Sequence, residues 1–153
     1  MRWTPLALAF FLTACSSTEP ADPAAFDPIP FRTLAQDRYG SEDAGLVVIR
    51  SQAEEDAFLA GLDSPRFPET VRYGSEMVVG VRLGMRGNTG FSVDVFAIEA
   101  DADGATVHAQ ETDRGGGRTA LTYPSHFVVT QRVEGAVVLV PVGVVRSYED
   151  EAP

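Results

Sequence analysis

The fold is constrained most by a series of short apolar segments that are separated by turn residues. The segments have the β-branched or alternating composition of strands. They cover residues 45–50, 76–83, 91–98, 105–112, 125–132 and 136–145. Short strands that recur about every eight to twelve residues are typical of antiparallel sandwiches and barrels. The sequence therefore predicts a mainly-β chain that folds as an antiparallel β-sandwich or roll.

One short helix is predicted, over about residues 52–62. Ser51 and Glu54 have the spacing of a capping box, in which each side chain satisfies a free backbone N–H of the first turn. Phe58 and Leu62 then continue an apolar stripe at helical spacing. We expect this helix to pack on one side of the strands or to cap one end of them.

The connections between the strands also have recognisable turn chemistry. Residues 84–90 predict a glycine-rich turn, residues 101–104 predict a tight hairpin, and residues 113–118 predict a flexible loop. We expect the last two segments to pair with each other across residues 133–135. Pro141 lies inside the final segment, which predicts that this strand is at an edge, bulged or broken there.

The N-terminus has the features of an export signal. One positive charge, Arg2, precedes an apolar run that is far shorter than the roughly 20 residues needed to span a bilayer. The sequence Leu-Thr-Ala-Cys at residues 12–15 resembles the lipobox of bacterial lipoproteins. The resemblance implies cleavage before Cys15, diacylglycerol on its sulfur, and an envelope protein held to a membrane by its acyl chains. Ser16 after the cysteine, where an Asp would favour the inner membrane, favours the outer membrane or the cell surface.

The domain organisation follows from the composition along the chain. Residues 1–14 are the expected lipoprotein signal peptide, and residues 15–29 are the acylated cysteine with a flexible tether rich in Pro, Ala and acidic residues. Residues 30–148 are expected to form a single β domain. Residues 149–153 form an acidic tail.

Several classes of function are disfavoured by composition. The formal net charge is −10, so the phosphates of nucleic acid would be repelled. The single Cys excludes an intrachain disulfide and a cysteine-based zinc knuckle. His108 and His126 lie within predicted strands without a neighbouring nucleophile or a metal-ligand spacing, so neither is expected to be catalytic. We expect no enzyme activity, no metal and no cofactor.

Two loops remain as candidate partner-binding segments. Each has a structural interpretation, as a hairpin connection or a slack connector, and a functional one, as a recognition loop. The first offers a Thr hydroxyl and an aromatic ring, and the second offers two Arg side chains in an otherwise acidic protein. The candidate residues are Asn88, Thr89, Gly90, Phe91, Arg114, Gly115, Gly116, Gly117 and Arg118.

Residues 71–129 contain segments that resemble the C-terminal domain of the PrcB-like proteins. The matching segments are residues 71–73, 76–81, 83–84, 88–93 and 122–129. The resemblance implies an accessory, often lipid-anchored subunit of a protease complex. The chain departs from the family pattern at Gly90-Phe91, where Gly-Gly-Tyr is usual, and at Ser125, where an aromatic residue is usual.

A weaker similarity points to the chagasin-like inhibitors of papain-type cysteine peptidases. Residues 88–91 and 115–117 are similar to two of the three inhibitory loops of that family, in the same order. Residues 131–133 lack the Trp of the third loop. We therefore expect a lipid-anchored, non-catalytic protein-binding subunit with a protease as partner. A direct inhibitor of cysteine peptidases, or a β-roll that binds a small ligand in its interior, are the alternatives.

Overall fold

A computed structural model describes residues 27–37, 39–62, 66–115, 117–140 and 143–146. The predicted signal peptide, Cys15, most of the predicted tether and the acidic tail lie outside the described residues, as do Gly116 and Pro141. In the described part of the chain, no helix has the length and apolar character needed to cross a membrane.

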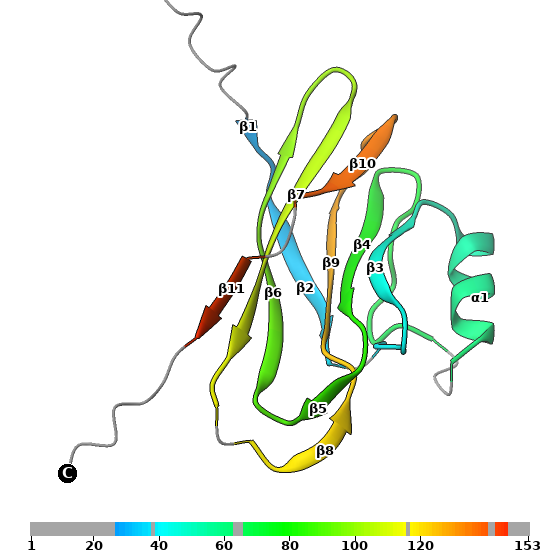
Figure 1. The fold of residues 1–153 in the computed structure, drawn as a ribbon. Helices are drawn as coiled ribbons and strands as arrows, with labels where there is room; N and C mark the ends of the chain where they lie inside the picture. Colours follow the sequence, from blue (N-terminus) through cyan, green and yellow to red (C-terminus); the bar gives the residue numbers. More distant parts are fainter. Residues whose placement is uncertain (1–26, 38, 63–65, 116, 141–142, 147–153) are drawn as a thin grey trace, which may run out of the picture.

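The strands form two sheets that pack face to face, with a small third sheet at one end (Figure 1). Sheet A contains β1 (Asp27–Pro28), β6 (Phe91–Ala100), β7 (Gly104–Asp113), β10 (Ala136–Leu139) and β11 (Gly143–Arg146). Sheet B contains, in spatial order, β2 (Phe31–Gln36), β9 (Ser125–Gln131), β4 (Glu76–Leu83) and β3 (Ala44–Ile49). The small sheet contains β5 (Arg86–Asn88) and β8 (Thr119–Thr122). The mainly-β sandwich with one helix is thus confirmed.

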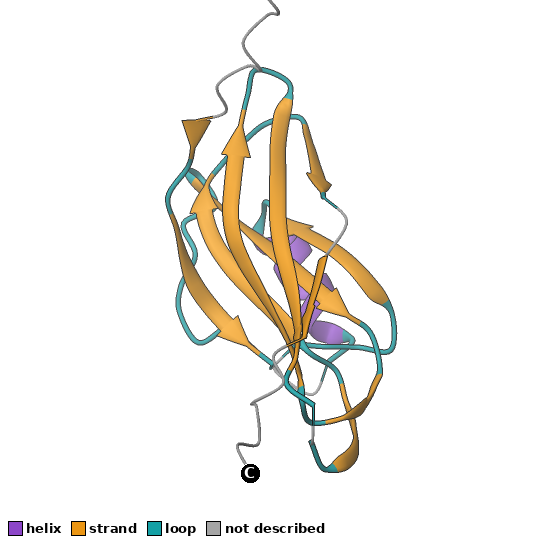
Figure 2. Ribbon diagram, turned by 60° about the vertical axis from the view of Figure 1, so that its left-hand side comes forward, coloured by secondary structure: helices purple, strands orange, loops and turns teal. Residues whose placement is uncertain are grey.

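The single helix, α1 (Gln52–Ala60), lies on the face of sheet B that is remote from sheet A (Figures 1 and 2). Ser51 is its N-cap and accepts a hydrogen bond from the Glu54 N–H at 3.2 Å. The Glu54 carboxylate reaches back to the N–H of Arg50 at 2.5 Å. The predicted N-cap of Ser51 is therefore formed, whereas the Glu54 carboxylate binds the N–H of the residue before the N-cap and not that of Ser51. The helix ends two residues before the predicted boundary.

Strand β4 separates two cores because successive side chains of a strand point to opposite faces. Met77, Val79 and Val81 point between the two sheets and are fully buried against the facing residues of β6 and β7. Val78 points toward α1, into a second core. Apolar side chains on both faces explain why β4 reads as a continuous apolar run in the sequence.

The second core is an aromatic cluster between sheet B and the helix layer. Tyr39, Phe67 and Phe127 meet edge to face or tilted, with ring centroids 5.1–6.4 Å apart, and Phe58 of α1 closes the cluster. Gly80 of β4 makes room for it, because a Cβ there would lie 2.2 Å from the Phe127 ring. The glycine inside an otherwise β-branched strand is therefore a packing requirement.

The predicted pairing of the last two strands is wrong. β9 lies inside sheet B with β2 on one side and β4 on the other, so it has no free edge for a following strand. The chain instead crosses to sheet A, where β10 and β11 both pair with β7 in parallel. The Arg50 guanidinium binds the crossing segment by donating hydrogen bonds to the carbonyls of Val133 and Gly135. Two separate strands on either side of residues 141–142 agree with a strand that is broken near Pro141.

Four strands were not predicted. β1 lies within the predicted tether, so sheet A begins at Asp27, three residues before the expected start of the domain, and β2 lies just inside that start. β5 lies inside the predicted glycine-rich turn, and β8 follows the predicted flexible loop. These strands are short or carry polar side chains, and their pairing depends on contacts distant in sequence.

Candidate functional site

The two predicted binding loops lie at one end of the sandwich, which we call the loop end. Phe91 begins β6 at this end and pairs with Asp113 at the end of β7. At the other end of β6, Ala100 pairs with Asp27 of β1, so we call that the β1 end. The length of β6 separates the two ends by about 30 Å. Figure 1 shows β5 and β8 at one extreme of the molecule and β1 at the other.

The two loops are joined by two backbone–backbone hydrogen bonds and one that a side chain accepts. The Thr89 N–H donates to the carbonyl of Arg118 at 3.1 Å, and the Thr89 hydroxyl accepts from the Arg118 N–H at 3.0 Å. The Arg114 N–H donates to the carbonyl of Gly90 at 3.1 Å. Two segments predicted independently thus form one continuous surface.

Glycine in the second loop is required by close packing. A Cβ on Gly117 would lie 2.4 Å from the backbone nitrogen of Gly90, so only glycine allows the loops to approach. The Asn88 side chain also tightens the first loop by accepting the Gly90 N–H at 2.7 Å. This geometry corrects the interpretation of residues 113–118 as a slack connector, at least for the described positions.

Arg86 anchors the loop end to the sandwich. Its guanidinium makes two parallel hydrogen bonds to the Glu111 carboxylate, at 2.9 and 3.0 Å, and a third to the carbonyl of Leu83 at 2.7 Å. It also lies 5.7 Å from the centroid of the Phe91 ring. Hydrogen bonding to Glu111 raises the pKa of Arg86. This pair was not predictable, because nothing in the local sequence links positions 25 residues apart.

A polar cleft lies beside the first loop. It has a volume of about 420 Å³, and its lining includes Gln36, Asp37, Thr89, Asp94 and Arg114. A neighbouring hollow of about 260 Å³ shares Asp37, Thr89 and Phe91 with it and adds Tyr123. The cleft is lined by carboxylates, a guanidinium and neutral hydrogen-bonding groups. Such a lining is better suited to binding a polar protein surface than an apolar small molecule.

The loop end also exposes charged and apolar groups. Arg114 and Arg118 are exposed, and neither guanidinium makes an ion pair with any of the described residues. On the small sheet and just before it, Leu121 is 66% exposed and Met85 is 51% exposed. Exposed arginine beside exposed apolar side chains is a composition found at protein interfaces.

His126 connects the two sheets near this end. Its Nδ1 accepts a hydrogen bond from the Val95 N–H at 2.9 Å, at a bulge of β6, and its Nε2 lies 3.0 Å from the Thr33 hydroxyl. Since Nδ1 is the acceptor, we assign the proton to Nε2, which donates to Thr33. The imidazole is 5% exposed and belongs to the sandwich interior. Burial lowers the pKa of His126, and the carboxylates of Asp94 and Asp37 partly oppose that effect.

The neutral form of His126 is therefore expected to make folding stability depend on pH. Below an ordinary His pKa of about 6.5 the unfolded chain takes up a proton that the folded chain resists. The free energy of unfolding should fall as the pH is lowered from about 7.5 to about 5.5. In urea denaturation at these two pH values, His126→Gln should reduce the difference, whereas the control His108→Gln should retain it. An equal pH dependence in the two variants would contradict this assignment.

His108 lies on the outer face of sheet A, as expected for a strand residue that faces outward. Its Nε2 is 3.1 Å from the Glu99 carboxylate, and its ring lies 5.9 Å from that of Phe96. Over the described ranges, no three His, Cys, Asp or Glu side chains are grouped so that they could hold a metal ion.

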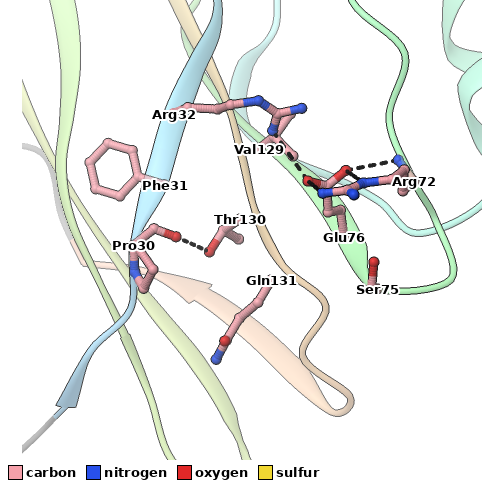
Figure 3. Close-up of a pocket in the computed structure, with 9 residues that line it drawn as sticks. All are labelled: Pro30, Phe31, Arg32, Arg72, Ser75, Glu76, Val129, Thr130 and Gln131. Atoms are coloured by element: carbon pink, nitrogen blue, oxygen red, sulfur yellow. Dashed lines mark hydrogen bonds and ion pairs between the residues drawn. The ribbon is translucent and has the colours of Figure 1, made fainter.

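A second hollow, of about 430 Å³, lies at the β1 end of sheet B (Figure 3). Figure 3 shows Arg32 and Arg72 both directed at the Glu76 carboxylate, at 3.6 and 3.2 Å. These hydrogen bonds and charges hold the pKa of Glu76 below its usual range. The charged groups of this hollow satisfy one another, and no local sequence pattern indicates the hollow.

Comparisons with protein-family models, with curated proteins and with solved structures gave no match. The resemblance to the PrcB-like proteins therefore stays a prediction. Residues 131–133, which were compared with the third loop of the chagasin-like inhibitors, begin at the last residue of β9 at the β1 end, where Gln131 pairs with Glu76. They lie at the opposite end of the sandwich from the two candidate binding loops.

Proposed function

We propose that this chain is a lipid-anchored lipoprotein of the bacterial cell envelope that binds another protein without catalysis. It acts as an accessory subunit, with a secreted or surface protease complex as its partner. The observation that carries the proposal is the union of the 88–91 and 114–118 loops in one surface at the loop end. The outer membrane or the cell surface is the proposed location, because Ser16 follows the lipidated Cys15.

The chemistry of the loop end supports docking to a protein. Arg114 and Arg118 supply planar guanidinium groups that can bind carboxylates through two hydrogen bonds each. Leu121 and Met85 supply exposed apolar contacts beside them. An acidic partner surface would be attracted to the two arginines. The rest of this chain, whose formal net charge is −10, would repel such a surface.

The position of the loops supports presentation away from a membrane. The chain that follows a lipidated Cys15 would join the domain at β1, which lies at the end opposite to the loops. The segment between Cys15 and Asp27 can span at most about 40 Å. Holding the domain within that reach raises the effective concentration of the loops near an envelope partner, without additional contacts.

The alternatives are less well supported. Inhibition in the manner of the chagasin-like proteins needs three loops that converge on one cleft, and residues 131–133 are remote from the other two. A small ligand inside the sandwich would compete with the tightly buried side chains of the first core, which are 0–5% exposed.

Capture of the tagged full chain from detergent-solubilised envelopes tests this proposal. The native chain should recover a protease-complex protein, and Arg114→Glu with Arg118→Glu should lower that recovery at least roughly tenfold, by replacing attraction with repulsion. The control Arg66→Glu with Arg72→Glu changes the charge equally at exposed sites elsewhere and should keep the recovery. Cys15→Ala should move the chain to the soluble fraction. Equal recovery by both charge variants would argue against docking through the loop end. A Cys15→Ala chain that stays in membranes would argue against the lipid anchor.

A further inference from the structure

Strand β3 leaves one edge of sheet B open. It pairs with β4 on one side, over all six of its residues and with no bulge. On its other side, the described residues contribute no paired strand and no backbone hydrogen bond to positions 44–49, and β10 of sheet A approaches β3 without pairing with it. Alternate N–H and C=O groups of β3 therefore point away from the sheet, as a template for another strand.

The usual protections of an edge strand are missing from β3. Its sequence, AGLVVI, contains neither a charge nor a proline. The edge strand β2, in contrast, carries an Arg and a bulge between Thr33 and Ala35, and β1, β10 and β11 have only two to four residues each. Leu46, Val47 and Val48 remain only partly buried, so a strand added to β3 would cover them.

We propose that two copies of this chain associate through antiparallel pairing of β3 with β3, which would make one continuous sheet from the two copies of sheet B. The association is a two-fold, self-complementary contact, the commonest arrangement in homodimers. It goes beyond the protein-binding function and does not rest on it, because the loop end takes no part.

Hydrogen bonding and charge select one register. When a two-fold axis relates two antiparallel strands, the free N–H and C=O groups of the two copies can pair only if one residue faces the same residue of the second copy. With Leu46 opposite Leu46, Arg50 lies opposite Glu42 of the second copy, at both ends of the paired segment. The guanidinium of Arg50 donates hydrogen bonds to two carbonyls and makes no ion pair within the described residues, although its charge also acts on Glu134. Shifting the centre to Gly45 or Val47 loses this match.

The side chains are also complementary in this register. Gly45 lies opposite Val47 of the second copy, and a Cβ at Gly45 would meet nothing within 4 Å, so there is open space for the valine. Ala44 lies opposite Val48 in the same way, which again places a small side chain beside a larger one. Cross-strand neighbours lie about 4.5–5.5 Å apart at Cβ, so these pairs would be in contact.

Cysteine cross-linking tests the register directly. In a full chain that carries Cys15→Ser, and so has no other thiol, Leu46→Cys should form a disulfide-linked dimer on mild oxidation, because the two Cβ atoms lie opposite each other. The exposed control Val138→Cys in the same background should not. Cross-linking at both positions alike, at neither, or of Leu46→Cys to a different protein would overturn the proposal.

Charge variants test the same pairing without a thiol. Glu42→Arg should weaken dimerisation roughly tenfold in sedimentation equilibrium of the full chain in detergent, because two repulsive pairs replace two attractive ones. Asp103→Arg makes the same change of net charge at the β1 end and should leave the dimerisation constant within about twofold. A native chain that stays monomeric at millimolar concentration, or equal effects of the two variants, would contradict the proposal. The Arg114→Glu and Arg118→Glu variant should dimerise normally, so failure of the docking proposal and failure of this one are distinguishable.

Discussion

Replacing Arg86 with leucine is expected to lower the free energy of unfolding by about 3 kcal/mol. The side chain of Glu111 is 10% exposed and has Arg86 as its charged partner, so the substitution leaves a buried carboxylate without compensation. The carbonyl of Leu83 and the ring of Phe91 also lose the guanidinium. Since Arg86 connects β5 to β7, the 88–91 loop should lose its position together with the stability.

Urea denaturation followed by circular dichroism measures this effect. Arg86→Lys should recover part of the loss, because an ammonium keeps the charge but cannot make the two parallel hydrogen bonds. The control Arg72→Ala removes an exposed ion pair with Glu76 and should change the free energy by less than about 1 kcal/mol. An Arg86→Leu chain that is as stable as the control would show that this pair does not anchor the loop end.

Phe127→Ala is expected to have the largest effect on stability, a loss of about 3–5 kcal/mol. The ring is fully buried at the centre of the aromatic cluster, where it fills the space left by Gly80 and contacts Tyr39, Phe58 and Phe67. Removing it leaves a cavity between sheet B and α1 and also removes the ring–ring contacts.

The matched control for Phe127 is Phe96→Ala, the same substitution at a side chain that is 60% exposed. It should alter the free energy of unfolding by no more than about 0.5 kcal/mol. Thermal or urea denaturation of the two variants compares them directly. Similar losses in both would mean that the cluster between sheet B and the helix layer does not support the fold as described.

Some elements were predictable because their local sequence is decisive. The bounds of β4 agree with the predicted segment 76–83, since an apolar run buried on both faces leaves little ambiguity. The capping-box spacing of Ser51 and Glu54 located the start of α1 in the same way. β2 was not predicted because its side chains do not alternate between apolar and polar. Arg32 and Thr33 are both exposed, and a bulge between Thr33 and Ala35 interrupts the pattern.

Pairing between strands was less predictable than the strands themselves. The sequence does not show that β9 is enclosed by β2 and β4, so a hairpin with the following strand looked reasonable. The candidate site has the same limit. Glycine, asparagine and arginine indicated both loops, but their hydrogen bonds to each other, the Arg86–Glu111 pair and the burial of His126 all depend on tertiary contacts.

The most direct test of the account is site-specific photo-cross-linking of the full chain in intact cells. A photoreactive phenylalanine analogue would replace Leu121 at the loop end or Asp103 at the β1 end, both exposed positions. The account predicts an adduct between the Leu121 probe and another envelope protein, and no such adduct from Asp103. Adducts formed equally from both positions, or from Asp103 alone, would contradict the assignment of the loop end as the partner-binding surface.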